Sequence, residues 1–77
     1  MSKFPVLTGA KAISLFQKAG FYWDRTKGSH HILKKKGHPF NLSIPVHKGK
    51  TLGKGLLQQQ IRNAGMTEEE FLALLHK

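Results

Sequence analysis

The hydrophobic period changes twice along this 77-residue sequence, from helical spacing to strict alternation and back to helical spacing. Apolar residues recur every three or four positions over residues 9–19, which predicts an amphipathic helix capped by Thr8 and ended by Gly20. Residues 40–46 alternate apolar and polar side chains, as expected of a strand with one buried face. A chain with these two periods must cover one face of a sheet with helices.

Two further strands are predicted between the first helix and the alternating segment. Residues 21–26 are rich in aromatic side chains and residues 29–35 follow a glycine turn, so the two segments should form a hairpin. In the third strand, the apolar side chains are expected to face the core, and Pro45 should lie at an edge or near a strand end. The inward set is Phe40, Leu42, Ile44 and Val46.

Helical spacing returns over residues 54–64 and stops at Gly65. Thr67 and Glu70 then have the spacing of a capping box, which predicts a short last helix. Pro5 favours an extended lead-in over residues 2–7. The expected fold is α+β in a single domain, residues 1–77, with the order helix, three-stranded antiparallel sheet, helix and short C-terminal helix.

Charge limits the class of partner. The sequence holds 13 Lys and Arg against 4 Asp and Glu, a formal charge of +9, and three of the acids are Glu68, Glu69 and Glu70. Such a basic body favours a polyanion, with nucleic acid first. Cysteine is absent, and no apolar run approaches the roughly 20 residues that a membrane span needs. We expect a cytoplasmic protein without a membrane segment or a cofactor.

The segment 27–34 contains a glycine turn, a hydroxyl, two adjacent imidazoles and lysines. Histidine has an ordinary pKa of roughly 6.5, so it can give or take a proton near neutral pH. Because strand side chains alternate, His30 and His31 must face opposite sides. His31 faces inward if Leu33 joins the core, and the two histidines exchange places if Ile32 does; the sequence leaves both arrangements open.

An ordered set of motifs along nearly the whole chain resembles the HicA toxins of bacterial toxin–antitoxin pairs. These motifs are Ala19-Gly20-Phe21, Lys27-Gly28-Ser29-His30-His31-Ile32-Leu33, Ile44-Pro45-Val46-His47, Leu52, Gly55 and the run from Ile61 to Leu72. The chain departs from the family pattern where Leu56, rather than a polar residue, follows Gly55. That departure affects local contacts at the start of the second helix.

The resemblance implies a fold like that of a double-stranded-RNA-binding domain, an mRNA-cleaving ribonuclease, and a HicB-type antitoxin that covers the active site. In the family, the histidine that directly follows the Gly-Ser pair is catalytic. The pair corresponds here to Gly28 and Ser29, which makes His30 the expected catalytic residue.

RNA can be cut without a metal when a base activates its 2′-OH, an acid protonates the leaving oxygen and cations hold the phosphate. His30 is the expected base or acid, and His31 and His47 are candidates for a second group. The candidate RNA-binding residues are Lys27, Gly28, Ser29, Lys34, Lys35, Lys48 and Lys50.

Three other interpretations remain open. An RNA-binding module without catalysis would use the basic surface and the aromatic side chains of Tyr22 or Trp23. A metal site could be built from His30, His31, His38 and His47, although their spacing matches no standard pattern. Duplex DNA could be bound through the polar side chains of the second helix, which are Gln58, Gln59, Gln60, Arg62 and Asn63.

Overall fold

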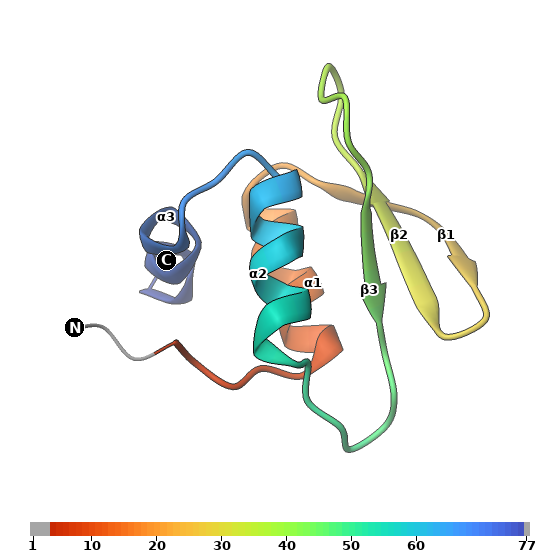
Figure 1. The fold of residues 1–77 in the computed structure, drawn as a ribbon. Coiled ribbons are helices and arrows are strands. Elements are labelled where there is room, and N and C mark those ends of the chain that lie inside the picture. Colours follow the sequence, from red (N-terminus) through yellow and green to blue (C-terminus); the bar gives the residue numbers. More distant parts are fainter. Residues whose placement is uncertain (1–3, 77) are drawn as a thin grey trace.

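The computed structural model describes residues 4–76, and it has the predicted order of elements (Figure 1). The elements are α1 (Gly9–Lys18), β1 (Tyr22–Lys27), β2 (His30–Lys34), β3 (Leu42–Pro45), α2 (Lys54–Asn63), α3 (Glu68–Ala73) and a 3-10 turn, η1 (Leu74–His76). The α+β prediction is confirmed. The predicted lead-in begins at Ser2, which with Lys3 lies outside the described residues.

The first helix has the start and end that the sequence predicts. The Thr8 side chain accepts a hydrogen bond from the backbone N–H of Lys11, 3.1 Å away, so Thr8 is the N-cap. Gly20 ends the helix with φ of 102°, a left-handed conformation that favours glycine. Leu15 and Phe16 are fully buried and form one side of the core.

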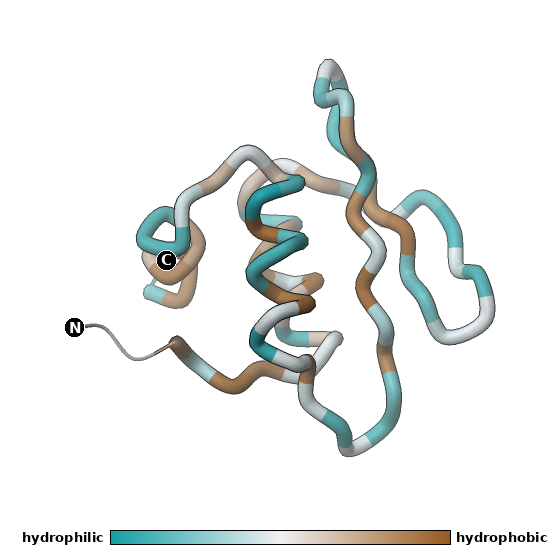
Figure 2. Tube along the Cα trace, in the orientation of Figure 1, coloured by the Kyte–Doolittle hydropathy of each residue, from teal (hydrophilic) through white to brown (hydrophobic). Residues whose placement is uncertain are grey.

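The sheet has the strand order β1-β2-β3, with both pairs antiparallel. The two long helices lie on one side of it, and β1 is the strand farthest from them (Figure 1). Leu33, Leu42 and Ile44 are fully buried against these helices. Figure 2 shows the matching alternation of hydropathy along β3. The opposite face of the sheet is not covered by any element of residues 4–76, and we call it the open face.

The C-terminal helices complete the core. Thr67 accepts from the N–H of Glu70, and the Glu70 carboxylate accepts from the N–H of Thr67, so the predicted capping box is present. The ring of Phe71 packs 4.8 Å from that of Phe16, which fastens α3 to α1. Across residues 4–76, every helix is too short or too polar to cross a membrane.

The free edge of β3 offers no backbone donor to another strand. The N–H of Ser43, which points away from β2, donates to Oε1 of Gln60 at 3.0 Å. The other outward position is occupied by Pro45, which has no N–H. The edge position expected for Pro45 is confirmed.

Two details of the predicted strands are wrong. Phe40 was expected inside, but it precedes β3 and its side chain is 59% exposed, because the third strand begins only at Leu42. Phe21 was expected to begin the first strand, but it lies just before β1, where it is buried. Its ring contacts Phe16 edge-on at 6.0 Å, so its burial comes from packing on α1.

Candidate active site on the open face of the sheet

A two-residue turn places His30 at the start of β2. Lys27 and His30 are directly paired across the hairpin, which leaves Gly28 and Ser29 as the loop. Gly28 has φ of 59°, and a hairpin loop of this length needs a positive φ that glycine adopts without strain. A Cβ on Gly28 would meet no atom within 4 Å, so the glycine serves backbone conformation rather than packing.

The two adjacent histidines lie on opposite faces of the sheet. Leu33 is fully buried, so His31, two positions earlier, faces the helices and His30 faces solvent. His31 is half-buried, and its Nδ1 is buried without a hydrogen-bond partner among residues 4–76. Of the two arrangements that the sequence left open, the structure has the one in which His30 is exposed.

His30 is held from one side by a hydroxyl. Its Nδ1 lies 3.1 Å from Oγ of Ser43. The two side chains share the open face because His30 pairs with Pro45, and Ser43 pairs with Ile32. The contact therefore runs diagonally across the β2–β3 pair, and it leaves Nε2 as the ring nitrogen with no hydrogen-bond partner among the described residues. Sequence reasoning did not select Ser43, since a serine in an alternating strand is the ordinary outward residue.

A β-bulge brings two further cations to this face. The register between β1 and β2 shifts between Trp23 and Arg25, so that Arg25 pairs with Ile32 and Lys27 with His30. Because paired residues share a face, Arg25 and Lys27 project from the open face beside His30. Arg25 was missing from the predicted RNA-binding residues. A simple period-2 count along β1 would have placed it on the opposite face.

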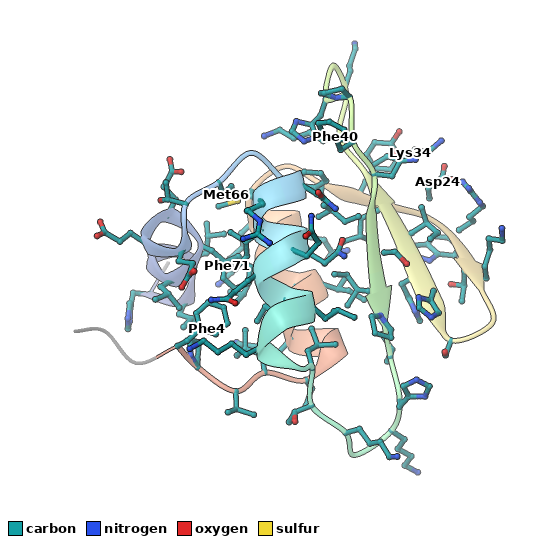
Figure 3. The ribbon with its side chains drawn as sticks, in the orientation of Figure 1. Phe4, Asp24, Lys34, Phe40, Met66 and Phe71 are labelled. Carbon is teal, nitrogen blue, oxygen red and sulfur yellow. The ribbon has the colours of Figure 1, made fainter. Side chains whose placement is uncertain are left out.

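The only acid of the sheet lies at this bulge. Asp24 pairs with Arg25 at 2.5 Å and with Lys34 at 3.7 Å. Figure 3 shows Asp24 and Lys34 together on the strand side of the molecule, away from the helices. One carboxylate is thus shared between two cations, so the open face keeps a net positive charge.

The other predicted RNA-binding lysines occupy different regions. The Lys35 ammonium lies 5.6 Å from the centre of the Phe21 ring, at the end of β2 remote from His30. Lys48 and Lys50 are exposed in the segment after β3. That segment starts at the His30 end of the sheet, since Val46 N–H donates to the carbonyl of Ser29 at 2.8 Å. Lys48 and Lys50 therefore follow the strand end nearest His30, whereas Lys34 and Lys35 lie at the opposite end.

The exposed aromatic side chains of β1 are divided between the two faces. Tyr22 is 51% exposed and pairs with Lys34, so it lies on the open face. Trp23 pairs with Leu33 and lies on the helix side, where its indole N–H donates to Oγ1 of Thr26 at 2.9 Å. Trp23 remains 53% exposed because β1 extends beyond the helices (Figure 1).

The remaining candidate residues are dispersed. Residues 4–76 contain no group of three or more His, Asp or Glu side chains placed to hold a metal ion. His38 lies at the far end of α2, where it contacts the backbone of Asn63. On the proposed DNA-reading helix, Gln60 is only 9% exposed and faces the sheet. Gln60 is therefore a packing residue and not part of an exposed polar face.

Comparison with known families agrees with the motifs. The model of the family described as HicA toxin of bacterial toxin-antitoxin matches residues 9–66, which is well over half of the 77-residue chain. The matched span runs from the first residue of α1 through the sheet to the end of α2, and it includes both His30 and Ser43. Among curated proteins, none matches this sequence.

Proposed function

Since the chain belongs to the HicA family of toxins, which are generally ribonucleases, we propose that it binds mRNA on the open face and cleaves it through His30. The observation that carries this proposal is the position of His30. Its ring is exposed on a face that also presents Lys27 and Arg25, with Nδ1 engaged by Ser43 and Nε2 without a partner among the described residues. A proton-transfer group beside fixed positive charge is what RNA cleavage requires.

The reaction begins with the RNA 2′-OH, which attacks the adjacent phosphorus. A base must take the hydroxyl proton, and an acid must give a proton to the departing 5′-oxygen. Nε2 of His30 performs one of these transfers. The 2′-oxygen forms a bond to phosphorus as the bond from phosphorus to the 5′-oxygen breaks. The products are a 2′,3′-cyclic phosphate on one fragment and a 5′-OH on the other, and this step requires neither a water molecule nor an oxidant.

Phosphate binding is assigned to cations that share a face or an end of the sheet with His30. Lys27 is its direct cross-strand neighbour, and Arg25 lies two positions away on the same face. Lys48 and Lys50 extend the positive charge beyond that end of the sheet. The amides of Gly28 and Ser29 lie in the turn next to His30, and Lys34 with Lys35 would contact RNA farther along the strand.

His47 is the better candidate for the second proton-transfer group. It is exposed two residues beyond Pro45, which is the cross-strand partner of His30. His31 faces the helices and is half-buried, so it cannot reach the same phosphate without a change in the strand. Exposure and strand facing therefore favour His47 over His31 as the second group, where the sequence favoured neither.

The toxin–antitoxin membership implies a protein partner, and we assign that partner a HicB-type antitoxin that covers the open face. A protein that competes with RNA for a surface of formal charge +9 should be acidic where it binds. Action on mRNA places the protein in the cytoplasm. RNA and antitoxin should therefore exclude each other in a binding titration, and independent binding of both would refute the shared surface.

The direct test is incubation of the purified protein with a short RNA, with and without EDTA. We expect cleavage in both samples, with cyclic-phosphate and 5′-OH ends identified by mass spectrometry. The control substrate is the same RNA with 2′-O-methyl groups, which removes the attacking hydroxyl while preserving the phosphates. Cleavage of the methylated RNA, or activity that EDTA abolishes, would contradict the proposed chemistry.

A non-catalytic RNA-binding module is the second candidate, and the exposure of Tyr22 favours it. Tyr22 lies on the open face with Lys34, where a base could stack on its ring. Under this alternative, RNA would bind but remain intact in the same assay. Tyr22→Ala would then weaken RNA binding, and His30→Ala would have no effect beyond that of any exposed residue.

A further inference from the structure

Ser43 contacts Nδ1 of His30, the ring nitrogen opposite the Nε2 that is proposed to face substrate. Its Oγ is 3.1 Å from Nδ1, and both residues lie on the open face of neighbouring strands. Strand pairing sets this geometry, because one diagonal step across β2 and β3 separates the two side chains. The contact does not depend on a mobile loop.

The backbone of Ser43 is held in place by α2 and by the core. Its backbone N–H donates to Oε1 of Gln60 at 3.0 Å, and the Gln60 side chain is only 9% exposed. Its two neighbours in β3, Leu42 and Ile44, are fully buried in the core. A hydroxyl on a strand anchored in this way has little freedom to move away from the imidazole.

We infer that Ser43 is a positioning residue that holds His30 in the tautomer with the proton on Nδ1, and this inference rests on the proposed catalytic role of His30. As a base, neutral His30 takes a proton at Nε2 and becomes an imidazolium. As an acid, the imidazolium gives the Nε2 proton back. In both directions Nδ1 keeps its proton, which is donated to Oγ of Ser43 throughout.

A hydroxyl suits this task better than a carboxylate would. The serine oxygen can accept the Nδ1 proton in both the neutral and the cationic form of the ring, and it carries no charge. A carboxylate at the same place would favour the imidazolium and make it a weaker acid. Ser43 therefore orients the ring without placing a charge beside it.

The test compares Ser43→Ala, Ser43→Thr and Ser43→Asp with the parent, and uses Ser14→Ala as the matched control. Ser14 is an exposed serine on α1, outside the sheet. We expect Ser43→Ala to lower kcat about tenfold, as loss of one orienting hydrogen bond allows, with little change in KM. Ser43→Thr keeps a hydroxyl and should restore most of the rate, and Ser14→Ala should behave as the parent.

The pH dependence separates positioning from a merely structural role. With Ser43→Asp, the limb of the pH–rate profile that reports His30 should move to higher pH, whereas a folding defect would lower activity at every pH. A parent-like profile for Ser43→Asp, or a parent-like kcat for Ser43→Ala, would overturn the inference.

A second readout does not require activity. Nitrogen NMR of the His30 ring should show a predominantly Nδ1-protonated tautomer in the parent and a mixed population in Ser43→Ala. Identical spectra would overturn the inference even if His30 is catalytic. Conversely, if His30→Ala cleaves RNA as fast as the parent, the proposed function fails, while the spectra still decide whether Ser43 selects the tautomer.

Discussion

His38 donates a hydrogen bond from Nε2 to the carbonyl oxygen of Asn63, 2.6 Å away, and so ties the β2–β3 connection to the last turn of α2. The same ring lies edge-on to Phe21, with centroids 5.5 Å apart. A half-buried imidazole thus satisfies a carbonyl at a helix end and covers part of the core, far from the proposed catalytic residue His30.

His38→Ala should therefore destabilise the protein without changing its chemistry. Loss of the hydrogen bond and of the ring contact should cost about 1–2 kcal/mol. In a domain of this size, that loss lowers the melting temperature by roughly 5–15 °C. The matched control is His47→Ala, which removes an exposed histidine. Equal melting temperatures for the two variants would show that the Asn63 contact contributes nothing to stability.

Gln60→Ala should also destabilise the fold, because it leaves the outward N–H of Ser43 without its acceptor. Leaving this partly buried donor without an acceptor should cost about 1 kcal/mol, the lower end of the range for a buried donor. Gln59→Ala is the control on the same helix, since Gln59 is exposed and water can replace its contacts. Urea unfolding of both variants measures the difference. A Gln59 variant as unstable as the Gln60 variant would contradict the account.

RNA affinity should depend strongly on salt. If about four cations neutralise phosphates of single-stranded RNA, log affinity should fall against log salt with a slope of about −3. Lys27→Ala should reduce that slope by about 0.7, whereas Lys11→Ala, on the outer side of α1, should leave it unchanged. A larger effect at Lys11 would place the RNA on the helices, away from the open face.

The two candidates for the second proton-transfer group should respond differently. His47→Ala should lower the cleavage rate by ~10-fold or more, at unchanged stability. His31→Ala should mainly lower the free energy of unfolding, because His31 packs between the sheet and the helices. Cleavage rates and melting temperatures, measured on the same preparations of both variants, would distinguish the loss of rate from the loss of stability. The reverse pattern would mean that the strand rearranges when RNA binds.

Local signals in the sequence predicted the helices well. Helix starts and stops depend only on residues within a few positions, so the local sequence was enough to predict them. This applies to the caps at Thr8 and Thr67 and to the end of the first helix at Gly20. Strand faces depend on partners elsewhere in the chain. Whether His30 or His31 faced outward could be settled only by the burial of Leu33 against the helices.

The bulge and the start of β3 show what the sequence could not reveal. An extra residue at the bulge moves the side chains after Trp23 to the opposite faces of the sheet from those that simple alternation predicts. No residue type in this segment indicates a bulge. Arg25 was not among the predicted RNA-binding residues, and its position on the open face follows from this reversal. Phe40 continues the alternation of β3, yet it lies beyond the end of the covered sheet and stays exposed. Periodicity indicates which residues share a face, and the length of the partner elements decides which are buried.

The cleavage rate of His30→Ala tests the central claim most directly. We expect kcat to fall by about 10²- to 10⁴-fold, while RNA affinity and melting temperature stay close to those of the parent. The exposed His76 provides the matched control, and His76→Ala should cleave at the parental rate. Near-parental cleavage by His30→Ala, or a loss of activity that is accompanied by unfolding, would contradict the assignment of His30 as the catalytic residue.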